Sequence, residues 1–149
     1  TMRPVARLSI DNPFEPERCT PDAAAPLAGK RRFPSAVFDV LDCRELRCFH
    51  LFGGYADRLL RLGPGLAVAA EQCGDTLLLH ELLCDRPVDW ETLAARLPFR
   101  NIRRVEFGFP PDRLGVEFGW EAPPEPEHLF LRGGWDLPEN FCIPAFAVT

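Results

Sequence analysis

The chain has 149 residues, 46% of them hydrophobic, and a formal net charge of −5, which is enough for one domain with a buried core. The negative charge argues against a nucleic-acid or anionic-membrane partner, since both bind clustered Lys and Arg. The one basic run, residues 30–32, is interpreted as a solvated loop, with a docking patch as the alternative. No apolar run approaches the ~20 residues that span a bilayer, and the first residues lack an apolar signal-peptide region. We therefore expect a cytoplasmic protein with no membrane partner.

Six cysteines invite a disulfide interpretation, but we expect free thiols. A core of this size needs no covalent staples, and several of the cysteines lie in apolar runs, where Cys acts as a small hydrophobic residue. The sequence contains no C-x-x-C and no histidine pair at ligand spacing, so it predicts no metal site. The cysteines are Cys19, Cys43, Cys48, Cys73, Cys84 and Cys142.

The first 35 residues differ from the rest of the chain. Val5–Ile10 is a strand-like run that Asn12-Pro13 ends. The stretch from Pro13 to Pro34 is rich in proline, alanine and charge, which is typical of a connector to a preceding domain. We therefore divide the chain into an N-terminal strand plus connector, residues 1–35, and an organised domain, residues 36–149.

Three segments open the organised domain. Residues 36–41 and 46–52 are apolar runs of strand length, and glycines follow the second one. Residues 55–62 place leucines between charged residues, which favours a short helix. We expect two strands and a short helix in this part of the chain.

The clearest local signals come next. The β-like runs Leu66–Ala70 and Thr76–Leu83 flank a turn that contains Gly74, which is typical of a hairpin. Residues 89–97 carry one apolar stripe at helical spacing, with Asp89 as the N-cap and Pro98 after the end. The sequence therefore predicts a hairpin followed by the main helix of the domain.

Three further strands are predicted after the helix, at residues 102–109, 116–120 and 128–132, because apolar and polar residues alternate or cluster there between proline-rich breaks. The tail from Gly133 to Thr149 has little periodicity but is rich in apolar residues, so we expect it to dock on the domain. The predicted fold class is α+β or mixed α/β, with a twisted, mostly antiparallel sheet and one main helix packed on it.

Several stretches follow the pattern of one enzyme superfamily. They are Phe38-Asp39 with Leu46–Phe49, the hairpin around Gly74 through Leu77–Leu79, the helix and strand that end in residues 105–112, Leu129–Arg132, and the ending Leu137–Pro144. From Phe38 to its C-terminus the chain thereby resembles the C-terminal half of a bacterial group within the GNAT superfamily of N-acetyltransferases. The resemblance implies a GNAT-like half that completes a sheet and forms part of an acceptor pocket.

The chain also departs from that pattern. Pro110 stands where the group usually has Thr, and Phe146 stands where Ser or Thr is expected. The acetyl-CoA loop of the superfamily, Q/R-x-x-G-x-G/A between a strand and a helix, has no counterpart among the glycine pairs here. We therefore expect no cofactor in this chain. Acetyl-CoA is implied only for a full-length protein, bound by an upstream domain or a partner chain.

The resemblance implies a base that deprotonates an acceptor amine and an acid that reprotonates the leaving thiolate. Glu81, which strand alternation places on the same face as Leu79, and Glu106 are candidate bases, because a carboxylate on an inner sheet face holds its proton more tightly when buried. Tyr55, the only tyrosine, is the candidate acid and follows two glycines that permit close approach of a ligand. Each has a structural alternative: the carboxylates face solvent at a strand edge, and the tyrosine packs.

Three further residues are candidates for a substrate pocket. His80 alternates with leucines in a strand, and the alternative is a core or edge histidine. Asp112 follows two prolines, and the alternative is that it caps the next turn. Trp120 offers a large apolar surface to a ligand, and the alternative is a core residue.

Two functions from different classes follow. The first is the substrate-side C-terminal domain of a GNAT-like N-acetyltransferase, which needs an upstream domain or a partner chain for catalysis. The second is a non-catalytic binding or dimerisation module that uses exposed sheet edges at Val5–Ile10 or Val116–Trp120 to pair with another chain. The sequence leaves open whether the chain is an enzyme by itself.

Overall fold

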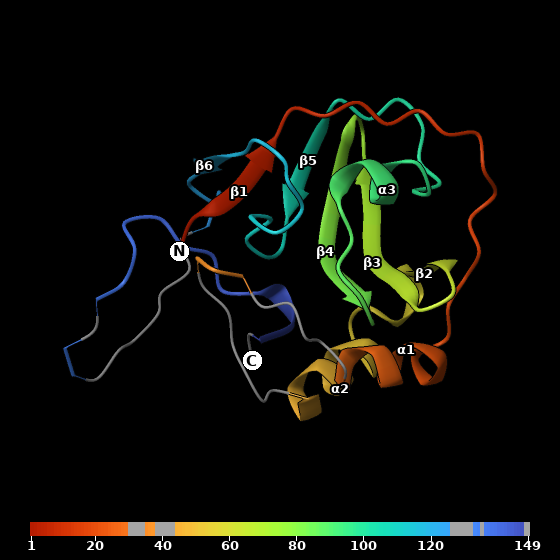
Figure 1. The fold of residues 1–149 in the computed structure, drawn as a ribbon, viewed down its shortest axis with the longest axis horizontal. Helices are drawn as coiled ribbons and strands as arrows, with labels where there is room; N and C mark the ends of the chain where they lie inside the picture. The colour runs from red at the N-terminus through yellow and green to blue at the C-terminus, as the bar shows by residue number, and fades with distance from the viewer. Residues whose placement is uncertain (30–34, 38–43, 126–132, 135, 148–149) are drawn as a thin grey trace.

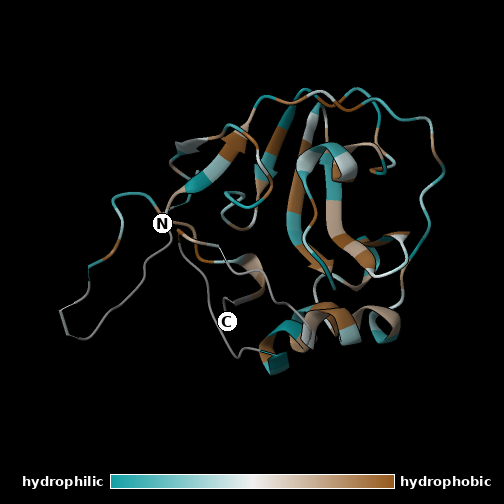
Figure 2. Cartoon of the chain, in the orientation of Figure 1, coloured by the Kyte–Doolittle hydropathy of each residue, from teal (hydrophilic) through white to brown (hydrophobic). Residues whose placement is uncertain are grey.

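The computed structural model describes residues 1–29, 35–37, 44–125, 133–134 and 136–147. One twisted sheet forms the centre of the molecule, with helix α3 on one face and helices α1 and α2 below the other (Figure 1). Hydrophobic residues follow the central strands, whereas the long connection after β1 is mostly hydrophilic (Figure 2). The coarse prediction of an α+β fold around a mostly antiparallel sheet is confirmed.

The sheet has six strands in the order β2-β3-β4-β5-β1-β6. Neighbouring strands are antiparallel, except that β4 and β5 run parallel. The strands are β1 Arg3–Ala6, β2 Leu59–Gly63, β3 Leu66–Cys73, β4 Thr76–Cys84, β5 Arg104–Phe107 and β6 Gly119–Glu121. Strand β1 therefore lies inside the sheet, between two strands from the far end of the chain.

Strands β3 and β4 form the predicted hairpin, with one irregularity. Ala69 pairs with Glu81 and Ala70 pairs with Leu79, so His80 is an extra residue in β4. Such a bulge shifts the alternation of side chains between the two faces of the strand. The prediction that Glu81 shares a face with Leu79 is therefore wrong: Glu81 lies on the opposite face of β4.

The helix α3, Trp90–Ala94, begins as predicted. Asp89 is its N-cap, and its carboxylate accepts a hydrogen bond of 2.8 Å from the backbone N–H of Thr92. The helix ends before the predicted residue 97, although Leu93 and Leu97 are both fully buried against the sheet. The helix is thus shorter than its apolar stripe.

Helix α2, Arg44–Phe52, corrects the prediction of a strand at 46–52. Its buried side chains are Arg47 and Leu51, one turn apart, whereas Phe49 and Phe52 are 68% and 54% exposed. The aromatic residues Phe49 and Phe52 therefore do not mark the inner face of this segment, and the apolar run that favoured a strand was misleading.

Helix α1, Pro21–Gly29, lies in the segment that was interpreted as a connector. Thr20 accepts a 3.3 Å hydrogen bond from the backbone N–H of Ala23, and Pro21 stands at the first helical position, where proline is favourable. The helix packs on α2 and lies against β4. The expectation of one main helix is therefore corrected to three α-helices among the described residues, whereas the division of the chain at residue 35 stays a prediction.

The remaining elements are shorter than predicted. Residues 55–62 form a turn, the 3₁₀ helix Ala56–Arg58 and then strand β2, rather than an α-helix. Within the strand predicted at residues 102–109, only Arg104–Phe107 forms a strand, β5. In place of the strand predicted at residues 116–120, the structure has the shorter β6, Gly119–Glu121. The predicted strands at 36–41 and 128–132, and the basic run, lie largely or wholly outside the described residues.

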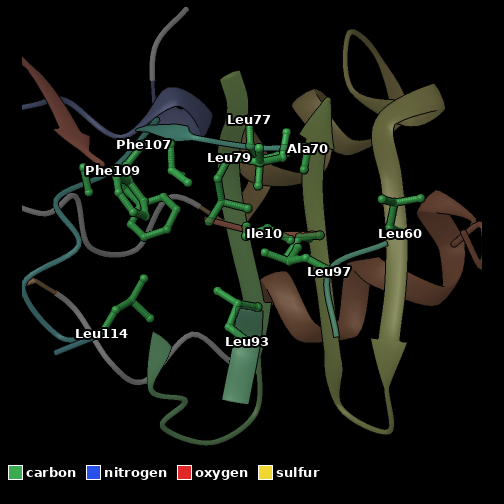
Figure 3. Close-up of a cluster of buried hydrophobic side chains, with 14 residues drawn as sticks. Ile10, Leu60, Ala70, Leu77, Leu79, Leu93, Leu97, Phe107, Phe109 and Leu114 are labelled. Carbon is green, nitrogen blue, oxygen red and sulfur yellow. The ribbon is translucent and has the colours of Figure 1, made fainter. Parts of the chain in front are cut away.

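Two hydrophobic clusters lie on opposite faces of the sheet. The cluster under α3 includes Leu77, Leu79 and Phe107, and Figure 3 shows how it fills the space between the sheet and α3. The second cluster lies between the sheet, α1, α2 and the C-terminal segment, residues 136–147. This segment includes the 3₁₀ helix Ala145–Ala147, in which Phe146 is fully buried. The expectation that the tail docks is confirmed for this segment.

No helix among the described residues is both long enough and apolar enough to cross a membrane. The five described cysteines, at positions 19, 48, 73, 84 and 142, are free thiols.

Candidate functional site

A pocket of about 250 Å³ lies beside the end of the parallel β4–β5 pair. Three of the predicted candidates, Tyr55, His80 and Glu106, line it together. The rest of its lining includes Arg3, Leu78, Gly108, Pro123, Cys142, Ile143 and Ala145. The fold therefore brings together strand β1, the hairpin, β5 and the C-terminal segment around one opening.

Gly108 lines this pocket at the point where β4, the end of β5 and the C-terminal segment are joined by backbone hydrogen bonds. Its N–H donates to the carbonyl of Leu79 at 2.8 Å, and its carbonyl accepts from the N–H of Ala145 at 2.6 Å. A Cβ at position 108 would lie 2.5 Å from the carbonyl oxygen of His80, closer than such atoms approach. Glycine at this position allows β4, β5 and the C-terminal segment to meet.

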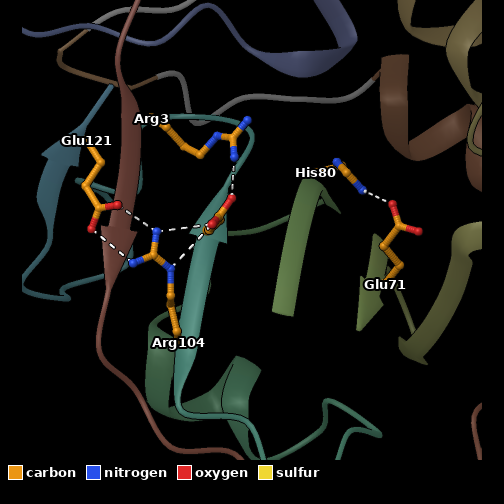
Figure 4. Close-up of polar contacts among 6 residues, drawn as sticks. Arg3, Glu71, His80, Arg104 and Glu121 are labelled. Carbon is orange, nitrogen blue, oxygen red and sulfur yellow. Dashed lines mark hydrogen bonds and ion pairs between the residues drawn. The ribbon is translucent and has the colours of Figure 1, made fainter. Parts of the chain in front are cut away.

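His80 is held by a chain of polar contacts across the hairpin. Its Nε2 lies 2.9 Å from Oε1 of Glu71, and Oε2 of Glu71 lies 3.0 Å from Nε of Arg58. Figure 4 shows the Glu71 contact at one edge of the imidazole ring. Because the Glu71 carboxylate accepts a hydrogen bond from Nε2, the neutral ring carries its lone pair on Nδ1.

The surroundings change the protonation of both partners. Burial lowers the pKa of His80 below its ordinary value, and the Glu71 carboxylate opposes that shift only in part. Burial alone raises the pKa of Glu71, but hydrogen bonds from His80 and Arg58 outweigh it, so the pKa of Glu71 lies below its ordinary value. At neutral pH the pair is therefore a neutral imidazole on a carboxylate.

Tyr55 is fixed by the rings around it. Its ring centroid lies 4.9 Å from that of His80 and 4.7 Å from that of Phe146. The guanidinium of Arg58 lies 5.8 Å from the Tyr55 ring centroid. The same arginine therefore contacts both the tyrosine and the carboxylate that holds His80, and the ring beside the pocket has little freedom.

Glu106 also lines the pocket and belongs to an ion-pair network, whose arginines, Arg3 and Arg104, are labelled in Figure 4. Its Oε2 lies 2.6 Å from Nη1 of Arg3, and its Oε1 lies 3.1 Å from Nη2 of Arg104. Arg104 also contacts Glu121 at 2.7 Å, which links β1, β5 and β6. Both oxygens of Glu106 already accept hydrogen bonds from guanidinium groups, so the geometry favours a role in charge placement over that of a general base.

The other candidates lie away from the pocket. Glu81 is fully buried in β4, and its Oε1 accepts from the N–H of Leu82 at 3.0 Å. Asp112 accepts from Oγ of Ser35 at 2.5 Å and from the N–H of Ala36 at 2.8 Å, which ties the 35–37 segment to the turn after β5. Trp120 stands opposite Pro4 in the β1–β6 pair, and its ring packs edge-on against Phe118 at 5.4 Å.

Sequence reasoning missed Glu71, Arg58 and Arg3 as parts of the site. Glu71 left a usable signal: a hairpin that turns at Gly74 places it diagonally across from His80 on one face. Arg3 left none, because only the folded sheet brings β1 beside β5.

The described residues contain no group of three or more His, Cys, Asp or Glu that could hold a metal ion. The connection from β4 to α3 has the strand-to-helix form that a CoA pyrophosphate site needs, but it does not fit one. The carboxylate of Asp89 already occupies the first turn of α3, and that helix has only five residues. Acetyl-CoA therefore has no fitting site at this connection.

Comparison of the chain with protein-family models, with curated proteins and with solved structures finds no match in any of the three.

Proposed function

We propose that this chain is the acceptor-side half of a GNAT-like N-acetyltransferase and that the β4–β5 pocket binds a small amine acceptor. The observation that supports the proposal most is convergence: Tyr55, His80 and Glu106, from three separate parts of the chain, line one pocket of about 250 Å³. Pockets for drug-sized ligands measure about 300–1,000 Å³. The acceptor is therefore a small molecule.

His80 is the residue that we assign to proton transfer. Its lowered pKa leaves the ring neutral near pH 7, and Glu71 holds it in one orientation. A neutral, oriented imidazole next to a bound ammonium can act as a general base. In that step an N–H bond of the ammonium breaks, the proton bonds to Nδ1, and the electron pair stays on the amine nitrogen.

Tyr55 and Glu106 have supporting roles in this proposal. The Tyr55 ring closes the pocket beside His80, and its hydroxyl offers a hydrogen bond to the ligand. Glu106 supplies the negative charge that attracts an ammonium group to the opposite wall. The chain thus binds and deprotonates an amine with its own residues.

The acetyl donor would be held by an upstream domain or a partner chain, because the connection before α3 does not fit it. The described thiols are free, which supports a cytoplasmic location for the assembled protein. On this proposal the chain alone binds amines and has no transferase activity.

An amide-resolved NMR titration of the chain with propylamine hydrochloride tests this proposal, with sodium chloride at equal ionic strength as the control. We expect the largest shifts at Tyr55, His80 and Gly108, and we expect the H80Q variant to weaken binding while Y55F weakens it less. Added acetyl-CoA should leave residues 85–94 unshifted. Absence of amine-dependent shifts around the pocket at millimolar ligand would reject the proposal.

A second candidate, a binding or dimerisation module without chemistry, is favoured by one observation. Phe49 and Phe52 lie one turn apart on α2 and are 68% and 54% exposed. Two large aromatic side chains on one exposed stripe are typical of surfaces that associate. In this candidate a homodimer forms through α2.

Sedimentation across a concentration series distinguishes the two candidates. The dimerisation module predicts a concentration-dependent dimer that the double variant F49S/F52S abolishes. A chain that stays monomeric at high micromolar concentration would leave only the acceptor-side proposal. The exposed residue Phe14, in the loop before α1, provides a matched control as F14S.

A further inference from the structure

We propose that the pocket selects a zwitterionic ligand, a small amino acid, by binding its carboxylate at Arg3 and its ammonium group between Glu106 and His80. This inference rests on the proposed amine site and names the class of molecule that carries the amine. Arg3, Glu106 and His80 all line the pocket.

Charge balance is the first argument. The side chains of the pocket walls and their supports pair three guanidiniums with three carboxylates: Arg3 and Arg104 with Glu106 and Glu121, and Arg58 with Glu71. His80 is neutral at pH 7 because burial lowers its pKa. A ligand with one charge would leave this partly desolvated network unbalanced, whereas a zwitterion adds one charge of each sign and no net charge.

The orientation of Arg3 is the second argument. Its Nη1 contacts Oε2 of Glu106 at 2.6 Å, and Figure 4 shows the other terminal nitrogen of Arg3 pointing away from the dashed contact. A guanidinium has five N–H donors in a planar fork, so one contact with Glu106 leaves donors for a second carboxylate. The side chain of Arg3 is 37% exposed and that of Glu106 is 15% exposed. The arginine therefore stands nearer the mouth of the pocket, and the glutamate is more deeply buried.

The arrangement of polar groups sets the orientation of the ligand. Glu106 and His80 both lie on strands in the sheet, β5 and β4, whose hydrogen-bonded pairing keeps them close. Leu78, Ile143 and Ala145 supply apolar surface to the same pocket. An amino acid with a short side chain places its ammonium at the sheet and its carboxylate at Arg3, and the pocket volume of about 250 Å³ excludes large side chains.

The test compares ligands of matched size on the wild-type chain: propylamine, propionate and β-alanine, each followed by the NMR shifts of residues around the pocket. We expect β-alanine to bind about tenfold more tightly than propylamine, which is the effect of one added charge-assisted contact. We expect propionate to bind more weakly than β-alanine.

Variants locate the preference. R3Q should reduce the β-alanine preference to about equal binding with propylamine, and R3K should keep part of it because the charge remains. R7Q is the matched control: Arg7 follows the same strand, is exposed and does not line the pocket, so the preference should be unchanged.

The outcomes separate this inference from the proposed function. If propylamine binds and β-alanine binds no better, the zwitterion inference is overturned and the amine site stands. If none of the three ligands binds, both fail. If R3Q and R7Q reduce the preference equally, the carboxylate is not at Arg3, and the inference is likewise overturned. The wild-type comparison needs no variant, so it decides the question even if R3Q is unstable.

Discussion

The two faces of the sheet share the same strands but hold different chemistry. The face under α3 is a dry cluster of aliphatic and aromatic side chains, among them Leu77, Leu79 and Phe107. The opposite face holds apolar residues as well, but also the fully buried Glu81 and the nearly buried Arg47 of α2. Burial of apolar side chains under α3 stabilises the fold, whereas burial of polar groups on the opposite face costs free energy.

The bulge at His80 creates this difference within a single strand. Before the bulge, odd-numbered residues of β4 face α3; after it, Glu81 and Leu83 face the helices α1 and α2. In a regular strand of the same sequence, Glu81 would share the face of Leu79 and its carboxyl group would lie in the aliphatic cluster. The bulge therefore keeps the Glu81 carboxyl group out of the cluster under α3 and leaves His80 at the pocket.

Substitution of adjacent leucines in β4 should show the largest contrast. Leu79 is fully buried under α3, so L79A should lower the free energy of unfolding by about 2–5 kcal/mol. Leu78 is half-buried beside the pocket, so L78A should cost clearly less. Urea denaturation of both variants measures the contrast, and equal losses would contradict the division between the faces.

A methyl group at Gly108 should have the next largest effect. The Cβ would meet backbone atoms of His80 at 2.5 and 2.9 Å, which cannot move without parting β4 from β5. We expect G108A to cost about 1–3 kcal/mol, as overpacking does, and to weaken amine binding. The control is G119A in β6, where nothing lies within 4 Å of the added Cβ, and it should have little effect on stability or binding.

Loss of the N-cap of α3 should lower stability by a smaller amount, and its effect should be confined to the sheet face that α3 covers. D89A removes the acceptor of the Thr92 N–H, and the first turn of a five-residue helix then loses its one described side-chain cap. We expect a loss of stability below that of G108A, with D89N retaining most of the cap. Thermal unfolding measures the loss, and NMR shifts at Tyr55 and His80 should stay unchanged.

The smallest effect should be a pH dependence on the polar face. Because the pKa of His80 in the folded chain lies below its ordinary value of 6.5, the unfolded chain binds the proton more readily. Stability from this group is therefore fully present above pH 6.5 and is lost as pH falls toward the lowered pKa. Between pH 7 and about 5, wild type should lose more stability than H80Q, and parallel curves would contradict a buried neutral His80.

Local patterns predicted the elements whose stability is local. Two β-like runs around Gly74 predicted the hairpin, and Asp89 predicted the start of α3. Both signals can be read from the sequence because a turn and a helix cap depend on residues only a few positions apart. Helix α2 escaped detection because its inner face presents Arg47 while Phe49 and Phe52 point outward. An amphipathic pattern cannot be recognised when the buried residue is charged and the exposed ones are aromatic.

The candidate site was predictable only in part, for a related reason. Tyr55, His80 and Glu106 were chosen as residue types with suitable chemistry, and the structure brings these three to one pocket. Glu81 could not be separated from them by sequence, because the bulge that turns it away leaves no sign in the alternation of β4. Arg3 and Cys142 reach the pocket from opposite ends of the chain, and no local rule connects them.

The position of β1 also constrains how the chain reaches its fold. Val5 pairs with Glu106 in β5 and with Gly119 in β6, so β1 leaves the ribosome well before either of its neighbouring strands is made. Until β5 emerges, β1 has both edges unpaired among these strands and offers a template for misplaced pairing. The hairpin can form early from local contacts, whereas closure of the sheet must wait for a long loop to close. The pocket, which needs β1 at one wall and the C-terminal segment at another, is consequently assembled only after the sheet has closed and that segment has been made.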